Sequence, residues 1–441
     1  MSLPEAKLYR LTATEVIARL KSGDFKVETY VRSLLSRIEE REPIVKAWAY
    51  YDPSHIIDQA RRLDNTPREE RGPLHGIPIG IKDVIYTQDM PTRHNSPIYD
   101  SSEPHLDAAT VSILRRAGAI IFGKTATAAF AAVGDGPATR NPHDPERTPG
   151  GSSSGSGAAV ADMHVPLALG TQTGGSVIRP ASFNGIFGMK PTWGAISTDG
   201  QKIFSPIFDT VGVFARSADD LQLLADVFRL TGDSTTIPFQ IEGSRFAVLK
   251  TVHWKQAEQD TVIAMETIAR LLRLHGATVE EVELPPDFEN LHLWHKQTIN
   301  TDGAVSFYRE YTIAKELLPE MLVRYVEKEQ GYSNSDKLSA MDNIARLRPR
   351  IDDILRGYTA AITPSTRGAA PFGFKTGSPI FNSLWTALHT PVINFPGFAS
   401  SNGLPIGLSL VSARYTDQRL LKVAKEVEKL LQSHGGWESK L

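Results

Sequence analysis

Cysteine is absent from this sequence of 441 residues. Its absence excludes disulfides, thiolate zinc sites, iron–sulfur clusters and every cysteine nucleophile. The 12 histidines are scattered, with no HExxH motif and no pair that shares a helical face beside a carboxylate. We therefore expect no metal site, and no other cofactor is predicted.

Long hydrophobic runs and an excess of one charge are missing as well. The 48 Lys and Arg residues nearly balance 50 Asp and Glu residues, for a formal charge of −2, so we expect no nucleic-acid partner. No apolar run approaches the roughly 18–20 residues that span a bilayer, so we expect no membrane partner. With 41% hydrophobic and 22% charged residues, the composition is that of a globular protein and excludes disordered, collagenous and coiled-coil chains.

The two ends of the sequence give information on where in the cell the protein is found. The first residues lack the basic and then apolar pattern of a secretory signal, and the missing cysteine fits a reducing compartment, so we expect an intracellular protein. The last three residues, Ser439-Lys440-Leu441, spell the peroxisomal address of eukaryotes. The sequence thus predicts a peroxisomal protein in a eukaryotic host and a cytoplasmic one in a bacterium.

Apolar periodicity divides the chain into four regions within one domain, residues 1–441. Residues 1–70 are predicted to be helical, with Thr12 or Thr14 as an N-cap and Gly23 as a helix stop. Short apolar runs typical of buried strands lie at 76–86, 117–125, 164–173, 245–251, 358–365, 390–396 and 404–412. Helical patterns lie between them at 154–163 and 218–231, and a last helix closes the chain. Interleaved strands and helices predict an α/β fold.

The second half contains a predicted helical insertion. From about residue 256 to 357 the apolar spacing is helical almost throughout, and the strand pattern returns over 358–441. No internal repeat and no low-complexity linker separates the regions, which favours one domain over two.

Two short motif matches are rejected on their context. Residues 118–125 (GAIIFGKT) fit the phosphate-loop pattern, but the four middle residues are apolar and β-prone, whereas a phosphate loop must curl around its ligand. Residues 151–155 (GSSSG) fit the nucleophile elbow of α/β-hydrolases, which follows a buried strand. The preceding residues 141–149 contain three prolines and exclude such a strand.

Two glycine- and serine-rich segments, 149–157 and 170–181, carry the candidate chemistry. Both lie within apolar, structured-looking sequence, and glycines let backbone N–H groups converge. Upstream, Lys82 lies in an apolar run. Burial lowers the pKa of a lysine and turns it into a base, whereas an ion pair with a neighbour such as Asp83 would make it structural. The residues alone leave these alternatives open.

Five longer segments are similar to the amidase signature family. They are GPLHGIPIGIKDV (72–84), TRNPHDPERTPGGSSSGSGAAVA (139–161), LALGTQTGGSVIRPASFNGIFGMKPT (167–192), SPIFDTVGVFARSADDL (205–221) and GLPIGLSLV (403–411). The resemblance covers most of residues 1–240 and the last 80 or so, and identifies 71–240 as the signature core. It implies a single large domain with a mixed, twisted central sheet covered by helices on both faces.

The resemblance also implies a Ser–cis-Ser–Lys triad and an acyl-enzyme mechanism. In this sequence the nucleophile maps to Ser176, the bridging serine to Ser152 and the lysine to Lys82. The oxyanion hole maps to the backbone amides of Thr173, Gly174, Gly175 and Ser176. A serine hydroxyl needs an adjacent base, and a neutral lysine acting through a second hydroxyl supplies one without histidine.

Two residues depart from the commoner family pattern. Gln172 stands where many members have Asp, and Arg179 lies three residues after Ser176 instead of two. This version resembles the malonamidase-like branch, in which an arginine at this offset can bind a substrate carboxylate. Gln172 and Arg179 are therefore candidate substrate-binding residues, with a buried structural ion pair as the alternative for Arg179.

The helical insertion and the loop 365–385 match no motif, and in such a fold we expect them to roof the pocket. Four aromatic residues there have two interpretations. They form an apolar acyl site or, as the interpretation that we favour, they are ordinary core and surface residues: Phe372, Phe374, Phe381 and Trp385.

The predicted function is hydrolysis of a C–N bond in a small carboxamide, anilide or carbamate. One alternative within the family is a carbamate (urethane) or ester hydrolase. Another is a glutaminase-type subunit of a tRNA-dependent amidotransferase, against which the missing basic patch and the variants at Gln172 and Arg179 argue. A non-catalytic scaffold is disfavoured because all three triad residues are present. The expected partner is a small amide or carbamate, and a homodimer is compatible with the sequence.

Overall fold

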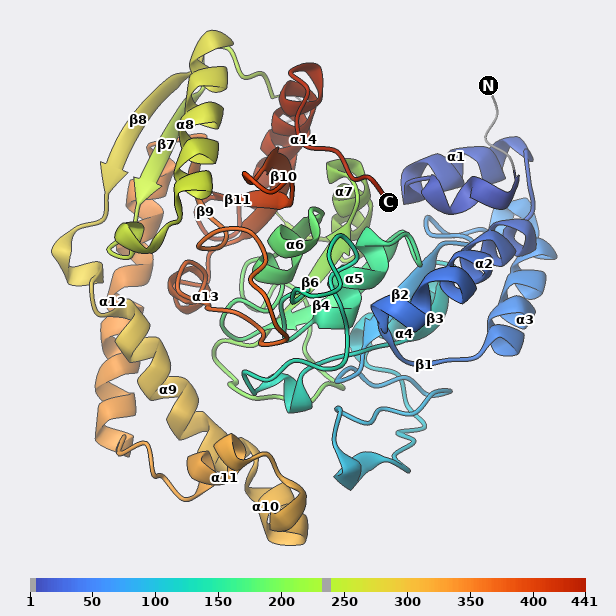
Figure 1. Cartoon of the computed structure of the whole chain (residues 1–441), viewed down its shortest axis with the longest axis horizontal. Helices are drawn as coiled ribbons and strands as arrows, with labels where there is room; N and C mark the ends of the chain where they lie inside the picture. Colours follow the sequence, from blue (N-terminus) through green and yellow to red (C-terminus); the bar gives the residue numbers. More distant parts are fainter. Residues whose placement is uncertain (1–4, 232–238) are drawn as a thin grey trace.

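An 11-stranded mixed sheet runs through the molecule, with the strand order β1-β3-β2-β4-β6-β5-β10-β11-β9-β7-β8 (Figure 1). The computed structural model describes residues 5–231 and 239–441. The strands are β1 (Trp48–Tyr51), β2 (Pro78–Lys82), β3 (Ile120–Thr125), β4 (Leu167–Gln172), β5 (Phe187–Lys190), β6 (Thr210–Ala215), β7 (Arg245–Lys250), β8 (Thr278–Glu283), β9 (Ala360–Pro364), β10 (Val392–Ala399) and β11 (Pro405–Val411).

Parallel and antiparallel pairs alternate in blocks across this sheet. β2 pairs in parallel with β3 and β4, and β7 pairs in parallel with β8 and β9. The strands between these blocks, from β4 to β9, are joined by antiparallel pairs. The predicted single α/β domain with a mixed sheet is confirmed.

Fourteen α-helices are described in the same residues. They are α1 (Ala13–Ser22), α2 (Val27–Val45), α3 (Pro53–Asp64), α4 (Ala109–Arg116), α5 (Ser154–Ala161), α6 (Ile178–Asn184), α7 (Ala218–Val227), α8 (Gln259–Leu274), α9 (Leu291–Ser306), α10 (Tyr308–Ala314), α11 (Glu320–Val326), α12 (Asn334–Arg356), α13 (Ser383–Ala387) and α14 (Asp417–Ser433). None of them is both long and apolar enough to cross a bilayer.

Alternation along the strands explains why helices cover both faces of the sheet. Successive side chains of a strand point to opposite faces. In β11, Leu408 and Leu410 join the core cluster that includes α14, whereas Val411 joins the cluster that includes α12 and α13. Strand β9 divides in the same way, with Ile362 in the first cluster and Ala361 in the second. Both faces are therefore apolar and buried.

The first helix begins and ends where the residues predict. Thr12 is the N-cap of α1 and forms a capping box with Glu15, and Gly23 ends the helix in the left-handed conformation at φ 82°. A side-chain N-cap satisfies backbone N–H groups that the helix leaves free. Of the two candidate caps, Thr12 is the one used.

Two strands lie where helices were predicted. β1 interrupts the N-terminal helices, and β8 interrupts the 256–357 segment, so β8 extends the sheet, α8 packs on it, and α9 to α12 form the rest of that segment. Both are edge strands with a single neighbour, and β8 (TVEEVE) carries three glutamates. An edge strand needs no continuous apolar run, and that run is the signal from which strands were predicted.

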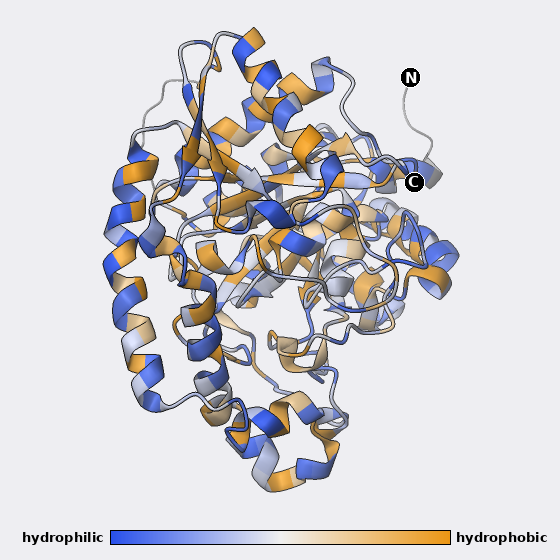
Figure 2. Ribbon diagram, turned by 60° about the vertical axis from the view of Figure 1, so that its left-hand side comes forward, coloured by the Kyte–Doolittle hydropathy of each residue, from blue (hydrophilic) through white to orange (hydrophobic). Residues whose placement is uncertain are grey.

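Helices α9 to α12 form an arm beside the sheet, coloured yellow to orange in Figure 1. α9 and α12 pack against each other, and α11 packs against α9. In the turned view of Figure 2 these helices carry hydrophobic and hydrophilic residues side by side along their length. They are amphipathic helices with one face toward the body of the protein.

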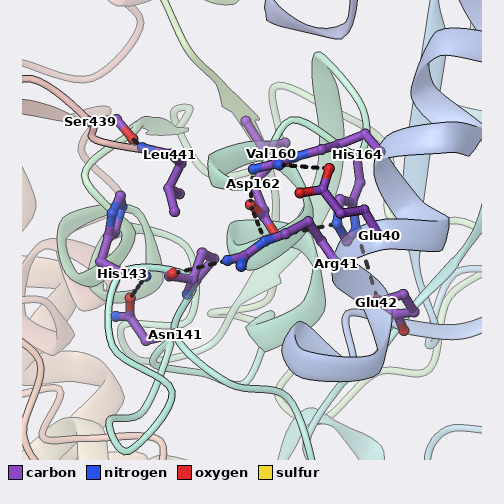
Figure 3. Close-up of polar contacts among 12 residues, drawn as sticks. Glu40, Arg41, Glu42, Asn141, His143, Val160, Asp162, His164, Ser439 and Leu441 are labelled. Atoms are coloured by element: carbon purple, nitrogen blue, oxygen red, sulfur yellow. Dashed lines mark hydrogen bonds and ion pairs between the residues drawn. The ribbon is translucent and has the colours of Figure 1, made fainter. Parts of the chain in front are cut away.

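A buried ion-pair cluster fastens α2 to the loop after α5 (Figure 3). The Asp162 carboxylate pairs with Arg37 Nη2 at 2.8 Å and with Arg41 Nε at 3.0 Å, and lies 3.4 Å from His164 Nε2. Burial disfavours the charged carboxylate, but His164, Arg37 and Arg41 outweigh that cost and hold the pKa of Asp162 below its usual range. The two arginines thus depend on one fully buried acid.

Replacing this acid leaves Arg41 without an ion-pair partner among the described residues, and leaves Arg37 with only the exposed Glu40 at 3.4 Å. We expect Asp162→Ala to lower the free energy of unfolding by about 3–5 kcal/mol, because an unpaired buried charge remains. Urea unfolding at pH 7 measures the loss. Because the folded-state pKa of Asp162 is lowered, its contribution disappears as the pH falls through that value, so the difference between the two proteins should narrow in acid.

The control variant is Asp58→Ala, which removes an exposed acid that lies 3.8 Å from Arg61. It should change the stability by no more than about 0.5 kcal/mol. Equal effects of the two variants would contradict the role given to Asp162.

Candidate active site

Lys82 is the last residue of β2, between β3 and β4 in the interior of the sheet, and its side chain is fully buried. Nζ donates hydrogen bonds to Ser152 Oγ at 2.8 Å and to Thr171 Oγ1 at 2.8 Å, and lies 3.4 Å from the Thr171 carbonyl oxygen. All its close partners are therefore neutral oxygens.

The burial of Lys82 decides its charge. Removal from water holds the pKa of the amine well below its usual range, the Asp209 charge opposes this shift, and the Arg179 charge adds to it. The alternative ion pair with Asp83 is wrong. Asp83 lies 3.7 Å from Lys124 Nζ, and Lys82 forms no ion pair within residues 5–231 and 239–441.

Ser152 lies in the loop before α5 and is almost completely buried. The Gly151–Ser152 peptide bond is cis. A Cβ on Gly151 would lie 2.5 Å from Thr376 Cγ2, so residue 151 has to be glycine for the loop to pack here. This packing sets the Ser152 hydroxyl against the Lys82 amine.

Ser176 lies in the turn between β4 and α6. The backbone N–H groups of Gly174, Gly175 and Ser176 donate to no acceptor in the part of the chain that the structure describes. Backbone donors left free beside a nucleophile are what an oxyanion hole requires. The described residues contain no hydrogen bond between Ser152 and Ser176, but both serines line one cavity.

The side-chain amide of Gln172 supports this turn through hydrogen bonds. Its Oε1 accepts hydrogen bonds from the N–H groups of Val177 at 2.9 Å and Ile178 at 3.1 Å, and its Nε2 donates to Thr386 Oγ1 at 3.0 Å. Thr386 Oγ1 in turn donates to the Gly174 carbonyl oxygen at 2.8 Å. The amide of Gln172 is buried and engaged within the protein, away from the cavity lining.

Two further residues support the turn and were not singled out from the sequence. The Asp209 carboxylate accepts a hydrogen bond from Thr173 Oγ1 at 2.5 Å, and burial raises the pKa of Asp209 to about 6. His295 Nε2 lies 2.8 Å from the Thr173 carbonyl oxygen, and burial lowers its pKa to about 4. Asp209 had a signal, a lone acid in the apolar segment 205–215, whereas His295 on α9 had none.

Arg179 on α6 is buried and has few partners. Nη2 donates to the Gly151 carbonyl oxygen at 2.5 Å, whereas Nε and Nη1 have no hydrogen-bond partner among the described residues. Burial lowers the pKa of Arg179 to about 9, so the guanidinium is still charged at neutral pH. The alternative of a structural ion pair is wrong, since Arg179 has no acidic partner within the described ranges.

These residues open into a cavity of about 610 Å³. Its floor includes Ser152, residues 173–176 and Arg179. Its outer wall comes from α9, α11, Gln330 and the loop around Thr376 to Pro379. The predicted roof, made by the helical insertion and the loop 365–385, is therefore confirmed.

The four aromatic residues of that loop are core and surface residues. Phe381 and Trp385 are buried, whereas Phe372 is 72% exposed and Phe374 is 40% exposed. Phe372 packs over the Arg147 guanidinium, and Phe374 packs over Arg140. Since none of the four lines the cavity, the interpretation as an apolar acyl site is wrong.

Several known proteins are similar to this chain over almost its whole length. A glutamyl-tRNA(Gln) amidotransferase subunit of Natranaerobius thermophilus is 30% identical over 480 residues, which cover 97% of this chain and 96% of that protein. Peptide amidase from Stenotrophomonas maltophilia has a TM-score of 0.80 and 27% identity, covering 96% of this chain and 97% of that one.

A third similar protein is a solved structure described as a vestigial protein complex that reveals the evolutionary origins of an s-triazine catabolic enzyme. Its TM-score is 0.87 at 25% identity, and the match covers 98% of this chain and 100% of that one. A family model named Amidase matches residues 29–421. This chain therefore belongs to the amidase signature family of enzymes.

Proposed function

We propose that this protein cleaves the C–N bond of a small carboxamide, anilide or carbamate through an acyl-enzyme on Ser176. The observation that carries the proposal is the buried Lys82 amine, whose pKa burial holds well below its usual range, 2.8 Å from Ser152 Oγ, together with the cavity that Ser152 and Ser176 both line. Lys82, Ser152 and Ser176 would then act as base, relay and nucleophile.

Acylation begins when Ser176 attacks the substrate carbonyl carbon. The Ser176 proton moves to Ser152 Oγ while the Ser152 proton moves to the Lys82 amine, because a hydroxyl donates and accepts at once. The free N–H groups of Gly174, Gly175 and Ser176 stabilise the oxyanion, at about 3 kcal/mol for each donor in use. Each of these steps uses only groups that the chain itself supplies.

The same relay then runs in reverse. The Lys82 ammonium returns the proton through Ser152 to the substrate nitrogen, the C–N bond breaks and the amine leaves. Water attacks the acyl carbon and gives up its proton along the same path. The relay then returns that proton to Ser176 Oγ as the Ser176–acyl bond breaks and the acid leaves. An ester or a carbamate passes through the same steps with a different leaving group.

Arg179 is the reason for proposing that the enzyme prefers substrates that carry a carboxylate. Its charged guanidinium lines the cavity and keeps two donor nitrogens free of protein partners. A carboxylate is the group that satisfies paired guanidinium donors best. We assign Arg179 to a substrate carboxylate, and Gln172 to positioning the Ser176 turn.

A glutaminase-type subunit of a tRNA-dependent amidotransferase is the second candidate. The names of the similar proteins favour it over the first candidate, because the Natranaerobius protein and others at 28–30% identity are named as a glutamyl-tRNA(Gln) amidotransferase subunit. Glutamine is itself a carboxamide with a carboxylate, so the Arg179 argument fits it as well. Release of ammonia from free glutamine, together with co-purification of a second amidotransferase subunit, would distinguish this candidate from the small-amide hydrolase.

Removal of the nucleophile tests the proposal. We expect Ser176→Ala to lower kcat by about 10³- to 10⁶-fold on every hydrolysed member of a panel of half-amides, anilides, carbamates and glutamine. The circular dichroism spectrum and thermal midpoint should not change. The control is Ser154→Ala at the start of α5, a buried serine whose hydroxyl has no hydrogen-bond partner among the described residues, and this variant should keep its activity. Full activity of Ser176→Ala would overturn the assignment.

The pH profile tests the base. Since Lys82 acts uncharged, kcat/KM of the wild-type protein should fall as the pH drops through its lowered pKa. Lys82→Ala should lose nearly as much activity as Ser176→Ala, and Lys82→Arg, which stays charged, should not restore it. Thermal midpoints at each pH separate titration from unfolding. A profile without an acid limb would contradict this role.

Substrate pairs test Arg179. Arg179→Ala should raise KM by about 10- to 100-fold for amides that carry a carboxylate, since a charged hydrogen bond is worth about 1.5–3 kcal/mol. Neutral amides of the same size should show a much smaller change. An equal rise for both kinds of substrate would assign Arg179 to structure instead.

A further inference from the structure

The described residues that line the cavity include basic side chains both near Ser176 and on the outer wall, and they include no acidic side chain. Arg179 lies on the floor beside Ser176, and Lys296 and Arg324 lie on the wall that the helical arm supplies. No Asp or Glu belongs to the described residues that line this cavity. His292 and His295 also line it, but burial lowers the pKa of both, so neither adds charge at neutral pH.

Helical spacing places the outer cations toward the cavity. On α9, His292, Lys296 and Asn300 follow at intervals of four residues and all line the cavity. On α11, Arg324 lies three residues after Met321, which also lines it. Residues three or four apart share one helical face, and α9 and α11 pack against each other. Both cations therefore border one space.

These outer cations are available to a ligand. Lys296 is exposed, and its Nζ has no hydrogen bond or ion pair among the described residues. Arg324 Nε pairs with Glu329 Oε2 at 3.1 Å, but the two side chains are 47% and 49% exposed. Such an exposed pair is worth little, so an incoming anion can replace Glu329.

The cavity is large enough for a substrate bigger than a dicarboxylic half-amide. At about 610 Å³ it lies in the range of about 300–1,000 Å³ typical of sites for drug-sized ligands. A substrate of a few heavy atoms at Ser176 and Arg179 would leave the outer part unfilled. The rest of a larger substrate would extend toward Lys296 and Arg324.

We propose that Lys296 and Arg324 form a second anion-binding subsite, which selects amides carrying a further carboxylate several bonds from the scissile C–N bond. This inference rests on the proposed amide hydrolysis. It adds that the substrate is at least dianionic, with one carboxylate at Arg179 and the other at the wall formed by α9 and α11.

The test compares malonyl amides of ω-amino acids, from glycine to 6-aminohexanoate, with malonyl amides of ω-amino alcohols of equal length. The wild-type protein should prefer the acids at one or more lengths. Lys296→Gln and Arg324→Gln should each raise KM for the preferred acid about two- to fivefold, and the double variant about tenfold. KM for the matched alcohol should stay unchanged. High salt should weaken the preference, because these cations are exposed.

The charge control is Lys255→Gln, an exposed lysine that does not line the cavity, and it should leave both KM values unchanged. A wild-type protein that hydrolyses acids and alcohols equally well would overturn the subsite and leave the proposed function intact. An equal effect of Lys255→Gln and Lys296→Gln would overturn it too. If no amide on the panel is hydrolysed, binding to Ser176→Ala by calorimetry decides, since equal affinity for acid and alcohol then rejects the subsite independently of turnover.

Discussion

The withdrawal of one amine from water is the constraint on which the site depends. The pKa of Lys82 stays lowered only while its neighbours are neutral oxygens and no carboxylate pairs with it. The surrounding acids are arranged accordingly. Asp83, the next residue, faces Lys124, and Asp209 is engaged by Thr173. A direct carboxylate partner would stabilise the ammonium and remove the base.

The cavity is built from two parts of the chain with different tasks. Its floor comes from the signature core, where backbone turns and buried hydroxyls set distances to within hydrogen-bond range. Its outer wall comes from α9 and α11, whose side chains at this wall include the exposed Lys296 and Arg324. Lys82 lies on a central strand and the two serines lie in buried loops, apart from the outer cations on the helical arm, and such a division allows one chemistry to serve different substrates.

Much of the fold was predictable from apolar patterns. The runs that contain β2, β3 and β4 are buried on both faces, so their strands are continuous in hydrophobicity. β1 and β8 were missed because each pairs on one side only. The glycine at the turn after α1 was predictable because a left-handed residue ends the helix there.

The site was predictable only in part. Resemblance to the family motifs pointed to Lys82, Ser152 and Ser176 as the predicted triad, but no local pattern reports which side chains meet across more than a hundred residues. For both Arg179 and Lys82, the sequence left open a structural ion pair, and only the tertiary structure could exclude that interpretation. His295 reaches Thr173 from 122 positions away, and no spacing rule covers such a distance.

The hydrogen bonds that support the Ser176 turn join distant parts of the sequence. Gln172 in β4 and the Gly174 carbonyl both bond to Thr386 Oγ1, which the chain supplies more than two hundred residues later. A polypeptide still emerging from the ribosome lacks that hydroxyl until nearly nine-tenths of it has been translated. The hydrogen bonds that hold the Ser176 turn can therefore form only after most of the chain has been made, and a shorter chain would have the motifs of the signature core without this support.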